Sequence, residues 1–197
     1  MRRRRGIISG NFSKLGLLCL ALVLGMGSLT VGYTAWPATV TIEGTVTTGS
    51  WERCETGYAY GNGYATCFDQ YGFSNWGWTN GELSYGSYTF PIYASAGGCD
   101  INSGILVGTL YVEYIGETVT VTYEMIDGYT MEETHLYIGS EPLPRKNGDY
   151  TTAPGQYPYK HVLEDATTDI YQVNGFSGGG IYVVAHAVAC WFEISPP

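Results

Sequence analysis

Thr118-Val119-Thr120-Val121-Thr122-Tyr123-Glu124-Met125 is the stretch of sequence that decides the fold class. Polar and apolar residues alternate through it without interruption, and a period of two residues indicates a β-strand. Side chains in a strand point alternately to opposite faces, so the apolar face holds Val119, Val121, Tyr123 and Met125. The stretch predicts a strand with one buried face and one face in water.

Strand patterns extend through most of the chain. They return in residues 85–93, 105–114, 134–139 and 169–173. Ile181 to Cys190 is apolar almost throughout, which is typical of a central strand covered on both faces. No stretch longer than about ten residues has a helical period. We therefore predict an all-β fold, an antiparallel β-sandwich of the jelly-roll or immunoglobulin-like type.

Residues 49–81 are rich in glycine, tyrosine, tryptophan and asparagine. Glycine at this density marks turns, so we expect short strands with long ordered loops here. Asn80-Gly81 is a pair that favours a hairpin turn. The region is expected to belong to a single domain, residues 36–197.

Residues 1–35 carry the parts of a secretory signal peptide in their usual order. A cationic front, Arg2 to Arg5, precedes an apolar run, Leu15 to Val31, and a small-residue exit. We predict a signal-peptide helix, cleavage after Thr34 or Ala35, and a secreted, cell-surface protein. The alternative is a retained anchor, because the run reaches the lower limit of length for spanning a bilayer. Contact with a membrane is expected only through such an uncleaved signal.

A second alternating stretch, Ala38 to Thr48, follows the predicted cleavage point. Its apolar face holds Val40, Ile42 and Val46. Such a strand either pairs within its own sheet or completes the sheet of a neighbouring molecule. The sequence leaves both alternatives open.

Leu17-Leu18-Cys19-Leu20-Ala21-Leu22-Val23-Leu24 and Val31-Gly32-Tyr33-Thr34-Ala35-Trp36 precede this threonine-rich strand. Together they resemble the export region of TasA/camelysin-type surface proteins, which carry a signal peptide of the SipW-dependent type. The resemblance covers the first quarter of the chain. It implies cleavage by a dedicated signal peptidase and, as in several relatives, assembly into surface filaments. Pro37-Ala38 departs from the Ser-Asp or Asn-Asp pair that usually follows the aromatic residue.

Most of residues 73–190 is similar to a module of secreted, often multidomain surface proteins of bacteria and archaea. The similarity is carried by Asn75–Gly81, Ala94–Asp100, His135–Gly139, Ala153–His161 and Ala185–Val188. It implies an exported β module and no particular chemistry.

The predicted mature chain is strongly acidic. Five of the nine basic residues and none of the 18 acidic residues lie in residues 1–35. Four basic residues then remain, which gives a net charge of −14. Such a surface repels nucleic acid and anionic membranes, so neither is expected as a partner. On other grounds, the partners that we predict are other copies of the chain or a surface polysaccharide.

Four cysteines follow the predicted cleavage point: Cys54, Cys67, Cys99 and Cys190. An even number in an exported chain predicts two disulfides, with three possible connectivities. We favour a short Cys54–Cys67 loop and a long Cys99–Cys190 link.

His135, His161 and His186 are all the histidines of the chain. Strands can bring distant residues together, so one interpretation is a three-histidine metal site. The favoured alternative is that His135 and His186 are core residues with hydrogen-bond partners. We therefore predict no metal and no cofactor.

The sequence patterns of common hydrolases are missing. The chain has no His-Glu-x-x-His, and Gly86-Ser87-Tyr88 lacks the second glycine of a serine-hydrolase elbow. Paired acids such as Glu132-Glu133 are adjacent in sequence and point to opposite faces of an extended chain. We therefore predict that the protein is not an enzyme.

Trp76 and Trp78 are the strongest ligand-binding candidates. Residues two apart on a strand share a face, so the indoles can form a sugar-stacking platform beside Asn75 and Asn80. The favoured alternative is that both tryptophans pack against the sandwich. The predicted function is a surface structural or interaction protein, such as a filament or matrix subunit. The alternative function is a polysaccharide- or ligand-binding module.

Overall fold

The computed structural model describes residues 50–194. The predicted signal peptide, its cleavage after Thr34 or Ala35, and the predicted strand with Val40, Ile42 and Val46 lie outside the described residues. Across the described range, no helix combines the length and the apolar character that crossing a membrane requires.

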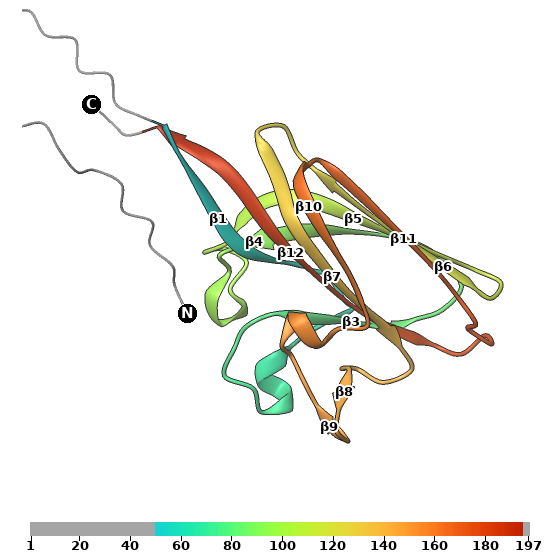
Figure 1. Ribbon diagram of the computed structural model, residues 1–197. Helices are drawn as coiled ribbons and strands as arrows, with labels where there is room; N and C mark the ends of the chain where they lie inside the picture. The colour runs from blue at the N-terminus through green and yellow to red at the C-terminus, as the bar shows by residue number, and fades with distance from the viewer. Residues whose placement is uncertain (1–49, 195–197) are drawn as a thin grey trace, which may run out of the picture. The chain divides into compact units, whose positions relative to one another are not determined.

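Between Ser50 and Ile194 the chain forms twelve strands and three short 3-10 helices (Figure 1). The strands are β1 (Ser50–Ala59), β2 (Ala65–Cys67), β3 (Trp78–Leu83), β4 (Gly86–Ala94), β5 (Ile105–Ile115), β6 (Thr118–Met125), β7 (Tyr129–Gly139), β8 (Arg145–Lys146), β9 (Asp149–Tyr150), β10 (Tyr159–Ala166), β11 (Thr168–Asn174) and β12 (Ile181–Ile194). The helices are η1 (Phe68–Tyr71), η2 (Gly97–Cys99) and η3 (Pro154–Gln156). The predicted all-β class is confirmed.

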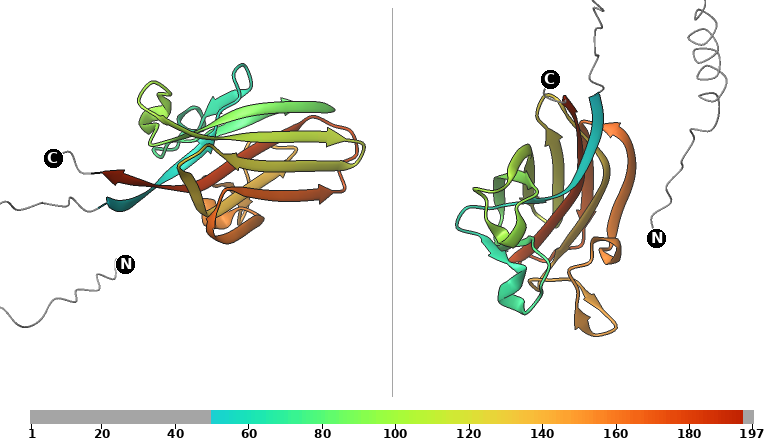
Figure 2. Two further views of the ribbon diagram at one scale, coloured as in Figure 1. Left: turned by 90° about the horizontal axis from the view of Figure 1, so that it is seen from above. Right: turned by 90° about the vertical axis from the view of Figure 1, so that its left-hand side faces the viewer.

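Ten of the strands in the described range form one antiparallel sheet. Its main path runs β10-β7-β12-β1-β4-β5-β6-β11, and β3 and β2 extend it beside β12. β1 pairs with β12 along Ser50–Tyr58 but with β4 only over Gly57–Ala59, so it links the two halves of the path. Figure 2 shows these halves as two layers, with β4, β5 and β6 facing β12, β7 and β10. The arrangement is the predicted β-sandwich.

The main core fills the space between the two layers. From β6 it takes the four side chains of the predicted buried face, Val119, Val121, Tyr123 and Met125. From β12 it takes Ile181, Val183, Ala185 and Ala187. Full burial of a large apolar side chain contributes about 1.5–3 kcal/mol, so this core is the main source of stability.

A second buried cluster lies on the outer face of β1 and β12. It consists of Tyr58, Phe68, Trp78, Ala96, Leu143, Tyr157 and Val184. Three of them lie in or beside η1, η2 and η3, and Leu143 lies in the loop between β7 and β8, so connecting segments cover this part of the sheet. β12 is therefore covered on both faces in its first half, as its apolar run predicts.

The four cysteines of the described range form two disulfides, but the favoured connectivity is wrong. The bonds are Cys54–Cys190 and Cys67–Cys99. Cys54 lies directly opposite Cys190 in the pair of β1 and β12. Cys67 and Cys99 both pack against the second cluster. The spacing of the cysteines in the sequence does not show which of them lie close together, because their proximity depends on which strands pair.

The hairpin turn predicted at Asn80-Gly81 is also wrong, because both residues lie inside β3. The Asn80 side chain is fully buried and bonds to three backbone groups. Its Oδ1 accepts from the amide of Gly61 at 2.7 Å, and its Nδ2 donates to the carbonyls of Ala59 and Val183. Asn80 therefore replaces missing backbone pairs between neighbouring strands rather than making a turn.

We predict that losing Cys54–Cys190 destabilises the protein more than losing Cys67–Cys99. The first bond joins residues 136 positions apart and the second joins residues 32 apart. Chain-entropy reasoning gives about 5 and about 4 kcal/mol for loops of these lengths. Denaturant unfolding of the two Cys→Ser double variants measures the difference. Peptide mapping without reduction checks the connectivity itself, and recovery of a Cys54–Cys67 peptide would contradict it.

Candidate functional site

His135 and His186 lie side by side on the two central strands of one layer. His186 on β12 is the register partner of His135 on β7 and of Tyr58 on β1. The three side chains therefore form a row on one face of the sheet. The Nδ1 atoms of the two histidines are 3.2 Å apart. The ring centroids of Tyr58 and His186 are 4.9 Å apart. We call His135 and His186 the histidine pair.

Burial keeps the histidine pair neutral. His186 is 4% exposed and His135 is 8% exposed. Burial, and then the nearby His135, lowers the pKa of His186 to about 3. Burial also lowers the pKa of His135, an effect that Glu133 opposes and Lys160 reinforces. Two neutral imidazoles at this distance form one hydrogen bond, in which one Nδ1–H donates to the Nδ1 of the other ring.

His161 does not join the other two histidines. Lys160 is the partner of His135 across β10 and β7, and His161 is the partner of Thr134. Adjacent residues of a strand face opposite ways, so His161 lies on the other side of the sheet. The three-histidine metal site is therefore not formed by the described chain.

His161 instead belongs to a polar network between the two layers. Its Nδ1 lies 2.8 Å from Oδ1 of Asp169 on β11, and its ring stacks on Tyr171 at 4.3 Å. Thr134 on β7 donates to Asp169 and bonds to the hydroxyl of Tyr171. Asp169 is therefore held from both layers. This network, which we call the Asp169 network, connects β7 and β10 with β11.

The predicted sugar-binding residues are part of the packing around the second cluster. Trp78 is 2% exposed, and its ring meets Trp76 at 71° with 5.7 Å between centroids. Such an edge-to-face pair is a packing geometry, whereas a stacking platform needs exposed ring faces. Asn80 is buried with backbone partners, and Asn75 accepts a hydrogen bond from Thr152. The structure brings Trp76 and Trp78 together but leaves them no shared exposed face.

Tyr58 is the main residue of this region that sequence reasoning missed. It contacts His186 on one side and makes edge-to-face contacts with Phe68 and Trp76 on the other. Burial raises the pKa of Tyr58 to about 12, so its phenol stays protonated. The sequence offered one signal. Tyr58 follows Cys54 by four residues and Thr56 by two, so the three side chains share one face of β1.

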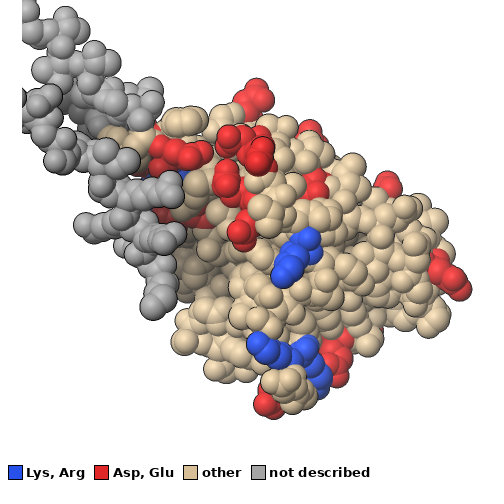
Figure 3. All heavy atoms as spheres, in the orientation of Figure 1, with Lys and Arg blue, Asp and Glu red and all other residues tan. Residues whose placement is uncertain are grey.

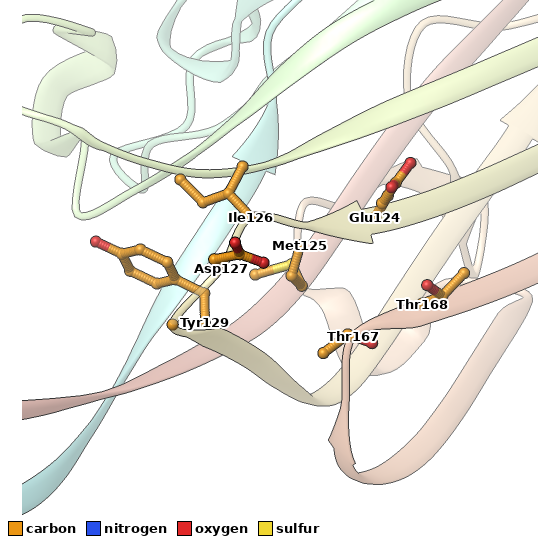
Figure 4. A pocket seen from close by; sticks show the side chains of 8 residues that line it. Glu124, Met125, Ile126, Asp127, Tyr129, Thr167 and Thr168 are labelled. Atoms are coloured by element: carbon orange, nitrogen blue, oxygen red, sulfur yellow. The ribbon is translucent and has the colours of Figure 1, made fainter.

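Two shallow pockets lie away from the histidine pair. The first, of about 290 Å³, is formed where the turn after β6 meets the turn between β10 and β11. Figure 4 shows Asp127 beside Met125 and Ile126, with Glu124 turned away at the other end. The second, of about 270 Å³, lies at the glycine-rich loop before β12. Neither described lining contains a histidine or cysteine, so neither pocket offers a paired nucleophile and base.

Acidic side chains gather on the face that carries β1, β12, β7 and β10 (Figure 3). The carboxylates of Glu52, Glu132 and Asp165 lie within 4.8 Å of one another there. The acids that are scattered in the sequence are thus partly concentrated in space. This concentration attracts cations to the same face of the sheet on which His135 lies.

Comparison of the chain with protein-family models, with curated proteins and with solved structures gave no match. The resemblance to TasA/camelysin-type proteins therefore remains a prediction from the sequence. The functional argument rests on the geometry of the described residues.

We predict that protonation of His186 lowers the stability of the metal-free protein in mild acid. Its pKa is about 3 when folded and about 6.5 in an unfolded chain. The contribution is therefore complete above about pH 6.5 and is lost as the pH falls toward 3. The expected loss from this group is about 2 kcal/mol between pH 7 and pH 5.

Urea unfolding at a series of pH values, with EDTA present, measures this slope. His186→Gln removes the titrating group and should flatten the curve, while His161→Gln, which replaces the partly exposed ring outside the histidine pair, serves as the matched control. A slope that is identical in the native protein and in His186→Gln would show that other groups cause it. Direct NMR titration of the His186 ring gives an independent value.

We predict that Trp78→Ala destabilises the protein by about 3–5 kcal/mol, as removal of a buried aromatic ring usually does. Trp76 is only half-buried, so Trp76→Ala should cost less. Thermal unfolding of both variants measures the difference. If Trp76→Ala melts like the native protein but no longer binds a polysaccharide column that retains the native protein, Trp76 is a binding residue and the packing interpretation fails for it.

Proposed function

We propose that the protein is a secreted structural subunit of the cell surface that assembles with other copies by β-strand addition. The observation that carries this proposal is the state of the two end strands of the sheet. Within residues 50–194, β10 pairs only with β7 and β11 pairs only with β6. Each end strand therefore has a backbone edge that another strand can occupy.

Two features support an extracellular location for this assembly. The two disulfides are typical of proteins that fold in an oxidising compartment. The sequence of residues 1–35 has the pattern of an export signal.

β11 is the better acceptor of the two end strands. Natural edge strands are usually protected by charges and bulges. β10 carries such protection, with Lys160, Glu164 and Asp165 and an irregular register between Val162 and Ala166. β11 pairs regularly with β6 over seven residues.

The outer face of β11 also lacks charge. It consists of Thr168, Ile170, Gln172 and Asn174, and Ile170 is 57% exposed. The charged residue of the strand, Asp169, points inward into the Asp169 network. An incoming strand thus meets no like charge from the acidic chain along this edge.

The predicted strand Ala38 to Thr48 is a suitable donor. It alternates polar and apolar residues and stands directly before β1 in the chain. Eleven extended residues reach about 36 Å, which exceeds the roughly 23 Å of the seven-residue β11. The competing arrangement is that this strand pairs with an edge of its own molecule.

Two variants test the proposal in the secreted protein. Removal of residues 36–48 should leave a folded monomer that no longer forms filaments, because it removes the donor strand. Ile170→Lys should reduce assembly while leaving the melting temperature nearly unchanged, because it adds a charge at the acceptor edge. Ile115→Lys is the matched control, since Ile115 is 67% exposed but belongs to an inner strand.

Negative-stain electron microscopy and light scattering measure assembly, and circular dichroism measures folding. An unfolded deletion variant would mean that residues 36–48 pair within their own sheet. Filaments from Ile170→Lys as long as those of the native protein would exclude β11 as the acceptor. A native protein that stays monomeric would overturn the assembly function.

A further inference from the structure

The two Nδ1 atoms of the histidine pair are as far apart as two ligands of one metal ion. They are separated by 3.2 Å. Nitrogens that bind one ion at about 2.0–2.1 Å lie about 2.8–3.0 Å apart at the right angles of a tetragonal Cu(II) site and about 3.3–3.4 Å apart at a tetrahedral site, so the observed separation falls between the two. We propose that His135 and His186 chelate a late first-row transition-metal ion, with Cu(II) preferred, through these two atoms. The ion takes the place of the proton that the two rings otherwise share.

The charge state of the two rings suits a metal. A metal-binding imidazole must be neutral, and proton competition is the usual obstacle to binding near neutral pH. The hydrogen bond between the two Nδ1 atoms needs one of them as an acceptor without a proton, so only the other must give up its proton to the ion.

The scaffold holds the two nitrogens in place. β7 and β12 are directly paired along ten residue pairs, and the main core packs beneath them. Tyr58 packs against the His186 ring. A site on two paired inner strands keeps its ligand atoms nearer to one geometry than a site on loops does.

Glu133 offers an outer partner for the site. Its Oε2 lies 3.7 Å from Nε2 of His135, so a small movement closes a hydrogen bond from that nitrogen. A carboxylate behind a histidine ligand is the common arrangement in metal proteins, where it fixes the ring and raises its basicity. Lys160 opposes a cation at the same place, and the acidic side chains of this face counter it.

The histidine pair supplies two of the ligands that such an ion needs. The groups of three or more potential ligands within the described residues do not include His135 or His186. Water that reaches the pair on the side of His135, which is 8% exposed, would have to supply the other ligands. Imidazole nitrogens suit Cu, Ni and Zn, and the general order of affinity places Cu(II) first among them.

Isothermal titration of the EDTA-treated, dialysed protein with Cu(II), Ni(II) or Zn(II) tests the proposal at pH 7.5. We expect one Cu(II) per chain, weaker Ni(II) and Zn(II) binding, and an electron paramagnetic resonance spectrum with coupling to two nitrogens. His135→Gln and His186→Gln should each weaken Cu(II) binding by more than about 100-fold, and Glu133→Gln by about 10-fold. His161→Gln is the matched control and should bind like the native protein.

Three results would overturn the proposal. The first is no Cu(II) binding by the folded native protein. The second is binding that survives both His135→Gln and His186→Gln. The third is binding that disappears in Glu52→Gln or Glu132→Gln instead, which would place the ion at the acidic cluster. Near-UV circular dichroism confirms that each variant is folded, and His135→Gln, at the rim of the pair, serves if His186→Gln does not fold.

Discussion

The pairing of β1 with β12 is the constraint on which the rest of the structure depends. It joins the first described strand to the last one, so it closes the chain on itself across nearly the whole domain. This register places Cys54 opposite Cys190 and Tyr58 opposite His186. β7 pairs with the other edge of β12, which makes β12 an inner strand with a core beneath it and loops above it. The first disulfide, the histidine pair and the second cluster all follow from that position.

Local patterns in the sequence were enough to predict the class of fold. The alternation in residues 118–125 identified β6 with its bounds and its buried face, because burial on one side of a sheet leaves a period of two. The apolar run of residues 181–190 identified a strand covered on both faces. Such patterns report the environment of one strand and carry no information about its neighbours. The cysteine connectivity was wrong for this reason, since it depends on which strands pair.

The candidate site was predicted in its residue types but not in its arrangement. His135 and His186 were singled out because they lie inside strand patterns, and the structure pairs them. His161 does not join the pair because it follows Lys160, the register partner of His135, and therefore faces the other side of the sheet. The sugar-binding interpretation placed Trp78 and Asn80 near a surface, but loops from several parts of the chain cover that face of the sheet, in line with the favoured packing interpretation. A local sequence pattern does not show which face of a strand will be covered by a loop from a distant part of the chain.

The Asp169 network holds the end strand β11 in position while the outer backbone edge of that strand pairs with no other described strand. In a closed barrel the edge strands pair with each other, and their backbone groups are used up. Here β10 and β11 belong to different layers, and side chains connect them: His161 and Thr134 hold Asp169, while Tyr171 lies under His161. The connection fixes the position of β11 without using its outer backbone groups. An acceptor edge that is already held in place loses little entropy when a strand is added, which is the property that strand addition requires.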